Sequence, residues 1–303
     1  MRQIYLDYNA TTPIAPSVRD ALLPFLSEHF GNPSSSHALG RACHEAIEDA
    51  RAETAAALDA DSDEIFFTSG GTESNNLALK GVLFREPIDN GSHLIISGIE
   101  HPAILQPAEF LRRQGYELTV VGCDSQGTVS PEAIQDALRP TTRLVSIMHA
   151  NNEIGSVQPI REISDLCHAQ DVLVHTDAAQ SVGKLPVTVS ELDVDLLSVA
   201  GHKLYAPKGV GALYVRRGIP LEPALHGAGH EGGVRPGTEN VPYIVGLGRA
   251  MTLATEDLNS RQERLAQLRD RLEEQLRDTL GDRMSINGLG AERLPNTSSV
   301  NFP

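Results

Sequence analysis

Cysteine is scarce in this sequence. Its three cysteines, Cys43, Cys123 and Cys167, are far apart and contain no Cys-x-x-Cys pair. A disulfide framework needs an even set of cysteines, and a cysteine-rich zinc site needs closely spaced ones, so the pattern predicts neither. Reduced thiols are the default, and they agree with a cytoplasmic protein.

Positive charge and long apolar runs are also scarce. The chain has 25 Lys and Arg against 40 Asp and Glu, a formal charge of −15, and no basic cluster. This balance disfavours nucleic acid and anionic membranes as partners. No uncharged apolar run approaches the roughly 20 residues that span a bilayer, and the N-terminus has no apolar signal region. We therefore expect a cytoplasmic protein without a membrane segment.

The sequence does contain a regular alternation of strand and helix patterns. From residue 61 to about 217, short apolar runs such as "EIFFTSG" (64–70) and "HLIISGIE" (93–100) each precede a helical pattern. This alternation is typical of a doubly wound, mostly parallel α/β sheet covered on both faces. In one of the helices, Ser130 is suited to the N-cap and Pro131 to the first helical position.

The C-terminal part differs from the rest. Leucines 265, 268, 272, 276 and 280 predict a long amphipathic helix, and we expect its apolar stripe to belong to a core. Two short strands follow, at 284–287 and 298–302. We expect a large domain of residues 14–250 and a small α+β domain of residues 1–13 and 251–303. Because two strands and one helix make a thin domain, we expect it to be incomplete at the C-terminus or completed by a partner.

Polar residues follow each predicted strand, where ligands bind in an open α/β sheet. The first group is a glycine turn with Gly71 and Thr72, which can hold a phosphate at a helix N-terminus or simply cap the helix. Asp177 ends an apolar strand, where it needs a cation or a backbone N–H partner. Lys203 follows another strand and is either a surface lysine or an amine nucleophile that forms a Schiff base. His101 and His202, taken singly, are ordinary imidazoles.

Together these groups fit one molecule. The glycine turn, Asp177 and Lys203 supply contacts for a phosphate, a protonated pyridine nitrogen and an aldehyde, the three functional groups of pyridoxal 5'-phosphate (PLP). A carboxylate at the ring nitrogen keeps the ring electron-withdrawing. A metal site at His226, His230 and Glu231 is the weaker alternative. The His-x-x-x-His spacing can place the two imidazoles on one helix face, but the glycines of residues 226–233 disfavour a helix there.

The chain resembles the class V aminotransferase-like family of PLP enzymes, the NifS-like cysteine desulfurases and selenocysteine lyases. The resemblance covers nearly the whole chain through the segments "YLDYNATTP" (5–13), "FGNPSS" (30–35), "FTSGGTESNNLA" (67–78), "EHPAI" (100–104), "IMHANNEIG" (147–155), "HTDAAQSVGK" (175–184), "GHKLYAPKGVGALYVR" (201–216) and "RPGTEN" (235–240). It implies the PLP-dependent transferase type I fold and a homodimer. It also implies removal of sulfur from L-cysteine, giving L-alanine and a protein persulfide for iron–sulfur cluster assembly or another sulfur-acceptor protein. The alternative activity is that of a selenocysteine lyase, with selenocysteine as the substrate.

The resemblance also implies roles for particular residues. Lys203 would bond covalently to PLP, and His101 would stack on its ring and transfer protons. The remaining contacts to cofactor and substrate would come from Gly71, Thr72 and His202 at the phosphate, Asp177 at the pyridinium, Gln180 at the ring oxygen, Thr238 at the phosphate of the other subunit, and Asn152 near the substrate.

Two departures from the family pattern matter. Ala200 stands where many desulfurases have serine, which removes one hydroxyl contact to the phosphate and weakens binding by roughly 1.5 to 3 kcal/mol. The persulfide-forming cysteine and the arginine that binds the substrate carboxylate belong to a C-terminal region absent here, and none of the three cysteines takes that role. An alternative of another class is therefore a PLP-binding but inactive partner subunit or fragment.

Overall fold

The computed structural model describes residues 4–85 and 91–302. The strands are β1 (Ile65–Thr68), β2 (His93–Ser97), β3 (Glu117–Val121), β4 (Thr142–Ser146), β5 (Leu173–Asp177), β6 (Leu196–Ala200), β7 (Gly211–Val215), β8 (Ser285–Ile286) and β9 (Val300–Asn301). The α-helices are α1 (Pro16–Leu22), α2 (Ala38–Leu58), α3 (Gly71–Leu83), α4 (Pro102–Arg113), α5 (Pro131–Ala137), α6 (Ile160–His168), α7 (Val189–Leu192), α8 (Val241–Thr255) and α9 (Leu258–Leu280).

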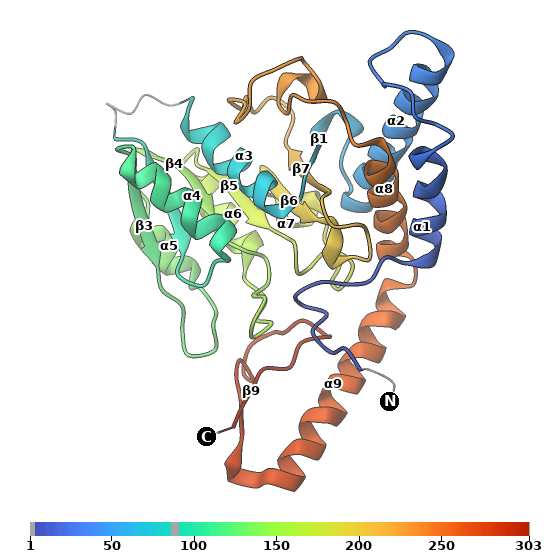
Figure 1. Cartoon of the computed structure of the whole chain (residues 1–303). Coiled ribbons are helices and arrows are strands. Elements are labelled where there is room, and N and C mark those ends of the chain that lie inside the picture. Colours follow the sequence, from blue (N-terminus) through green and yellow to red (C-terminus); the bar gives the residue numbers. More distant parts are fainter. Residues whose placement is uncertain (1–3, 86–90, 303) are drawn as a thin grey trace.

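One sheet of seven strands organises the molecule (Figure 1). Its strand order is β1-β7-β6-β5-β4-β2-β3, in which β2 to β6 pair in parallel and β7 is antiparallel to both β6 and β1. The chain order of the parallel strands reverses between β2 and β4, the kind of switch point beside which ligands bind. The predicted doubly wound, mostly parallel α/β fold is confirmed.

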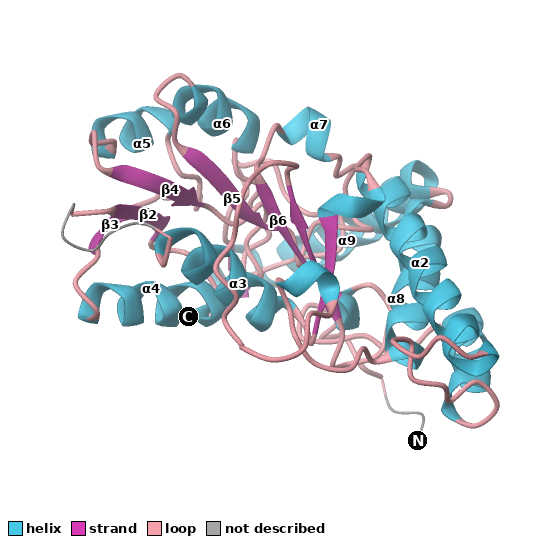
Figure 2. Ribbon diagram, turned by 90° about the horizontal axis from the view of Figure 1, so that it is seen from above, coloured by secondary structure: helices cyan, strands magenta, loops and turns pink. Residues whose placement is uncertain are grey.

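Helices cover both faces of the sheet, as Figure 2 shows, with α3 and α4 on one face and α5, α6 and α7 on the other. Strand β2 shows the cause in its sequence. Leu94 and Ile96 pack into the apolar cluster beneath α3 and α4, whereas Ile95 belongs to the cluster on the opposite face. Because successive side chains of a strand point to opposite faces, a continuous apolar run gives two cores, one on each side.

The predicted elements of this domain are found at the expected places. The predicted runs 64–70 and 93–100 contain β1 and β2, which end a few residues earlier because Ser69, Gly70 and, after β2, His101 line the strand-end cavity described below. The Ser130 hydroxyl accepts a hydrogen bond from the Ala133 N–H at 3.3 Å, and Pro131 is the first residue of α5. The predicted cap is therefore confirmed.

The long helix α9 is where an expectation was wrong. The helix forms as predicted, but its apolar stripe is not a core: Leu268 is 53% exposed and Leu272 is 49% exposed. In Figure 1, α9 extends away from the sheet, and the β8–β9 hairpin lies at its far end, so little of the described chain covers this face. None of the helices in residues 4–85 and 91–302 combines the length and apolar character needed to cross a membrane.

Candidate active site

A cavity of about 620 Å³ lies at the carboxyl ends of the parallel strands. Strands far apart in the sequence end there, so their following residues meet around one space. The residues that line it are Asp7, Asn9, Ala10, Ser69, Gly70, Gly71, Thr72, Glu73, Asn75, His101, Ala103, Met148, Ala150, Asn152, Glu153, Asp177, Ala179, Gln180, Ala200, His202 and Lys203. Eight of the nine residues predicted for the site are in this set, all except Thr238.

The glycine turn between β1 and α3 forms one end of this cavity. Gly70 has φ of 143° and ψ of 177°, a conformation that side-chain-bearing residues rarely adopt. The backbone of this turn also approaches β7, where a Cβ on Gly211 would meet the Gly70 Cα at 2.7 Å. Gly71 and Thr72 then begin α3, and their N–H groups point out of the helix start, where an anion is stabilised.

Asp177 is the last residue of β5 and is 6% exposed. Its Oδ1 accepts the Ala179 N–H at 2.9 Å, and its Oδ2 accepts the Asn75 amide at 2.7 Å. Burial raises the pKa of Asp177, and the hydrogen bonds and the nearby cations only partly oppose it. Among the described residues it has no ion pair within 4.0 Å. It is thus a buried carboxylate with neutral donors and no cation in contact.

Lys203 lies in the 3-10 turn that follows β6. Its Nζ donates to the backbone carbonyl of Asn9, in the N-terminal segment. Burial lowers the pKa of Lys203, while Asp177 and Asp7 act in the opposite direction. A lowered pKa increases the fraction of neutral amine, which is the nucleophilic form. Lys203 is half-buried and borders the cavity, so it is not a surface lysine that faces bulk solvent.

The other predicted residues take distinct positions. The Gln180 Nε2 donates to the Asn9 carbonyl at 3.0 Å. His101 is the N-cap of α4, where its Nδ1 accepts the Ala103 N–H at 3.1 Å and leaves the exposed ring at the cavity. The His202 Nδ1 lies 3.2 Å from the Thr11 hydroxyl oxygen. The backbone carbonyl of Asn152 accepts a hydrogen bond from the Asn9 side-chain amide at 3.3 Å.

Thr238 is exposed and does not line the cavity of this chain. It belongs to the glycine-rich segment 226–240, which is irregular apart from a short 3-10 turn at Glu231–Gly233. Arg235 of the same segment pairs with Glu73 at the cavity wall, with Nε 2.9 Å from Oε1. The segment is therefore tied to the cavity's edge, and the prediction that Thr238 serves a second subunit stays a prediction.

Sequence reasoning missed several residues of the site. Asn75 is buried and donates to Asp177, and the Asn9 carbonyl accepts from both Lys203 and Gln180. Asn75 follows Thr72 by three residues, one helical turn beyond the glycine turn, and this spacing was the available signal. No spacing rule links residue 9 to residue 203.

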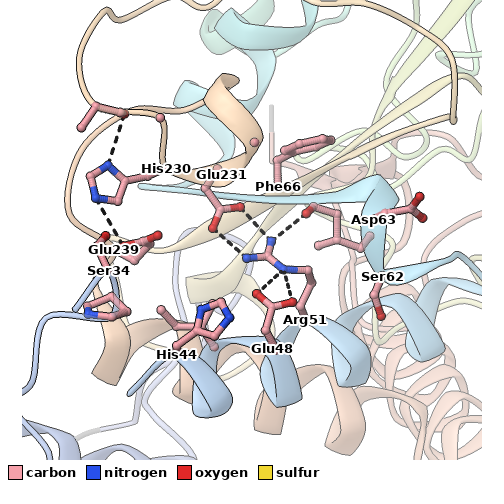
Figure 3. Close-up of a pocket in the computed structure, with 16 residues that line it drawn as sticks. Ser34, His44, Glu48, Arg51, Ser62, Asp63, Phe66, His230, Glu231 and Glu239 are labelled. Carbon is pink, nitrogen blue, oxygen red and sulfur yellow. Dashed lines mark hydrogen bonds and ion pairs between the residues drawn. The ribbon is translucent and has the colours of Figure 1, made fainter. Parts of the chain in front are cut away.

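A second cavity, of about 700 Å³, lies between α2 and the segment 226–240 (Figure 3). The arginine and the buried glutamate of this cavity, Arg51 and Glu231, are paired with each other. The Glu231 carboxylate binds Arg51 at 2.8 and 2.9 Å and accepts the Phe67 N–H at 2.8 Å. Glu231 is thus engaged with arginine and backbone, and the 3-10 turn that carries it is not the helix that the metal hypothesis with His226 and His230 required. Among the described residues, no group of three or more His, Cys, Asp or Glu side chains could hold a metal ion.

Comparisons with known proteins agree with this geometry. Residues 4–303 match the family model "Aminotransferase class-V". The cysteine desulfurase IscS of Dictyoglomus turgidum is 50% identical over 301 residues, which are 99% of this chain and 76% of that protein. The IscS of Methanosarcina thermophila is 46% identical, over 99% of this chain and 74% of that protein.

Two solved structures extend the likeness to three dimensions. A NifS-like protein superposes with a TM-score of 0.95 at 39% identity, covering 99% of this chain and 82% of that one. A structure described as SspA in complex with cysteine gives a TM-score of 0.91 at 39% identity, covering 99% and 84%. Class V aminotransferases and IscS cysteine desulfurases are PLP-dependent. The chain belongs to the aminotransferase class-V family.

Proposed function

We propose that this chain is a PLP-dependent cysteine desulfurase, which takes sulfur from L-cysteine and releases L-alanine. One observation carries the proposal: the glycine turn, Asp177 and Lys203, from three separate strand ends, border one cavity. The IscS relatives and the solved structure with cysteine support cysteine as the substrate.

The residues present fit the cofactor. Asp177 is a buried carboxylate without a cation in contact, and a pyridinium N–H would supply one. Gly71, Thr72 and His202 would hold the phosphate at the start of α3, and Gln180 would donate to the ring oxygen. Lys203 is the only described lysine that lines this cavity, and it would make the covalent bond.

When bound, PLP supplies an electron sink that stabilises negative charge developing on the substrate. The chain's own groups then hold and move protons. The Lys203 amine, with its lowered pKa, can accept a proton from the substrate's α carbon. His101, held at the start of α4, would stack on the ring and transfer a proton, and Asn152 would orient the substrate.

The sulfur needs an acceptor thiol. Cys43 and Cys167 are buried, and burial raises the pKa of the Cys167 thiol to about 12. Cys123 is exposed but does not line the cavity. We therefore propose that sulfur passes to a thiol other than these three, such as one on an acceptor protein.

The remaining parts of the proposal concern assembly. We propose a cytoplasmic homodimer in which Thr238 reaches the phosphate of the second subunit; the Arg235–Glu73 pair supports this because it holds that segment beside the cavity. We also propose a large domain of residues 14–250 and a small domain of residues 1–13 and 251–303. In the described part of the chain, only three buried apolar residues lie outside 14–250, namely Met251, Ala254 and Leu294, which supports this division.

The test is alanine release from cysteine and from selenocysteine, measured side by side with added PLP and a small thiol acceptor. We expect alanine from cysteine in wild type and none from Lys203→Ala. Release from selenocysteine alone would replace the desulfurase with a selenocysteine lyase. No release from either substrate by PLP-loaded wild type would contradict the proposal and favour a PLP-binding, inactive subunit.

A further inference from the structure

Lys184 is a buried lysine without a carboxylate partner. It is 9% exposed, and among residues 4–85 and 91–302 it makes no ion pair within 4.0 Å. Its Nζ donates to two oxygens of one residue, the backbone carbonyl and the side-chain Oε1 of Gln180, each at 3.0 Å. A buried amine without a counter-charge is unfavourable, and methionine would fill the same space without that penalty. Packing alone does not account for this lysine.

The contacts of Lys184 fix the orientation of the Gln180 amide. Its Oε1 accepts from Lys184, and its Nε2 donates to the Asn9 carbonyl at 3.0 Å. Rotation of the amide by 180° would bring the NH₂ group against the lysine's N–H donors and the oxygen against a carbonyl oxygen. Both hydrogen bonds would be lost, so a single orientation remains. The second N–H of the amide has no protein partner in the described part of the chain.

Lys184 and Gln180 belong to one connected set of contacts that includes Lys203. Gln180 lines the cofactor cavity, Lys184 lines another cavity of about 770 Å³, and Lys203 borders both. The Asn9 carbonyl accepts from Gln180 and from Lys203. Burial and the charge of Lys203 lower the pKa of Lys184 to about 7. Both its charged and neutral forms carry N–H donors, so the contact to Gln180 persists in either.

We propose that Lys184 is a positioning residue, which holds the Gln180 amide with its free N–H toward the ring oxygen of PLP. This inference rests on the proposed function, because it needs the ring to lie beside Gln180. Lys184 itself does not touch the cofactor and acts through Gln180.

The test measures cofactor affinity and the visible absorbance maximum of bound PLP. Lys184→Met removes the donors while keeping an unbranched side chain. We expect about threefold to tenfold weaker PLP binding, the size of one lost hydrogen bond, and a shifted maximum. Lys184→Arg, which keeps N–H donors, should restore part of both. Lys208→Met is the matched control, because it removes the same charge from an exposed lysine, and it should leave the absorbance maximum unchanged.

A double-mutant cycle separates positioning from general packing. If Lys184 acts through Gln180, adding Lys184→Met to Gln180→Ala changes neither the PLP affinity nor the absorbance maximum further. Additive effects of the two substitutions would overturn the inference. Thermal unfolding of each cofactor-free variant checks that it is folded. If Lys184→Met does not fold, Lys184→Gln takes its place, because the glutamine side chain is too short for the contact; the same loss of PLP affinity is expected. If wild type binds PLP and Lys184→Met has the same PLP affinity and absorbance maximum as wild type, this inference is refuted and the proposed function is not. Wild type that does not bind PLP refutes the proposed function and this inference with it.

Discussion

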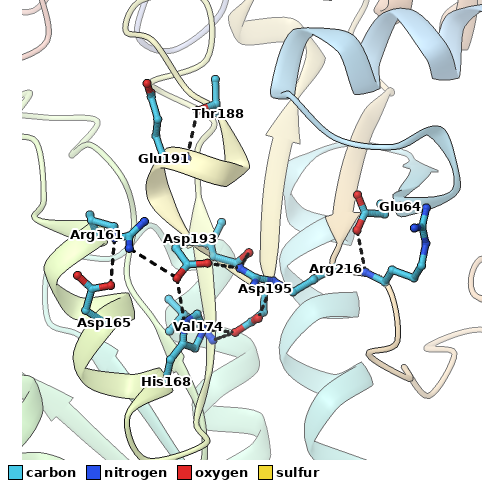
Figure 4. A network of polar contacts seen from close by, with 12 residues as sticks. Glu64, Arg161, Asp165, His168, Val174, Thr188, Glu191, Asp193, Asp195 and Arg216 are labelled. Atoms are coloured by element: carbon cyan, nitrogen blue, oxygen red, sulfur yellow. Dashed lines mark hydrogen bonds and ion pairs between the residues drawn. The ribbon is translucent and has the colours of Figure 1, made fainter.

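The two ends of strands β5 and β6 differ in whether their charged side chains form ion pairs. At the amino end, shown in Figure 4, Asp195 accepts the Val174 N–H at 2.8 Å and pairs with His168 at 2.9 Å and Arg216 at 3.1 Å. Neighbouring Asp193 pairs with Arg216 at 2.7 Å. At the carboxyl end, Asp177 and Lys203 make no ion pair with any described residue.

The carboxylate pKa values show the same difference. Burial acts to raise the pKa of Asp193, but Arg216, His168 and Arg161 outweigh it and the net pKa is lowered. Burial also acts to raise the pKa of Asp177, and there it prevails. A charge cluster that is complete within the chain stabilises the fold, whereas one left incomplete has capacity for a ligand. This comparison separates a structural cluster from a binding site on one sheet.

The largest expected effect is at the amino end. Asp195→Asn removes the charge that faces Arg216 and His168 and should lower the free energy of unfolding by about 3 kcal/mol, with PLP affinity unchanged. Denaturant unfolding measures it. Asp165→Asn is the control, because its pair with Arg161 is exposed and should cost less than about 1 kcal/mol. A loss of PLP affinity in Asp195→Asn would remove the distinction between the two ends.

The opposite result is expected at the carboxyl end. Asp177→Asn should weaken PLP binding by about 10- to 100-fold, because a hydrogen bond to a charged group is lost. The cofactor-free variant should be as stable as wild type or more so, since a buried carboxylate is gone. Equilibrium titration with PLP and thermal unfolding without it measure the two quantities. A strongly destabilised cofactor-free variant would assign Asp177 a structural role instead.

Per pH unit, Glu100 gives a stability effect of intermediate size. Burial raises its pKa from 4.5 to about 8, against hydrogen bonds from Ser97 and Met148. Because the folded pKa lies above the unfolded one, this stabilising contribution is complete below about pH 4.5 and is lost as the pH rises through 8. Between these values wild type should lose roughly 1 kcal/mol per pH unit from this group.

Glu100→Gln keeps the shape of the neutral acid and cannot ionise. Unfolding free energies of both chains from pH 5 to pH 9 should therefore converge at the acid end and separate in favour of the variant at the alkaline end. Parallel curves would mean that Glu100 is ionised throughout.

The smallest expected effect is a gain. Ala200 lines the cavity beside Gly71, where a Cβ built on the glycine would lie 3.2 Å from the Ala200 Cβ. Ala200→Ser would place a hydroxyl near the glycine turn and should strengthen PLP binding by about tenfold, the low end of the roughly 1.5 to 3 kcal/mol that a hydrogen bond to a charged group contributes. Titration with PLP measures this, and unchanged or weaker binding would show that the hydroxyl finds no phosphate there.

Sequence reasoning predicted the sheet and the meeting of its strand ends because both follow from local patterns. Apolar runs define the strands, and parallel strands bring their carboxyl ends to one edge, so Asp177 and Lys203 could be assigned to one cleft. The contacts that complete the site are different in kind. Asn9 reaches Lys203 across 194 positions, and Asn75 reaches Asp177 across 102. No periodicity encodes such pairs.

The helix α9 shows what a local sequence pattern does not predict. Leucine spacing predicted the helix correctly, since local periodicity determines it, but not whether its stripe is covered. Coverage depends on which other segments pack against a face, and that is a property of the tertiary structure.

The most direct test of the central claim is covalent trapping of PLP. The chain is loaded with PLP, reduced with borohydride, digested and analysed by mass spectrometry, with Lys203→Ala and Lys184→Met treated in the same way. The predicted result is one pyridoxyl group on Lys203 in wild type and in Lys184→Met, with none in Lys203→Ala. Labelling of Lys184, Lys208 or Lys80 in place of Lys203, or equal labelling of Lys203→Ala, would contradict the account.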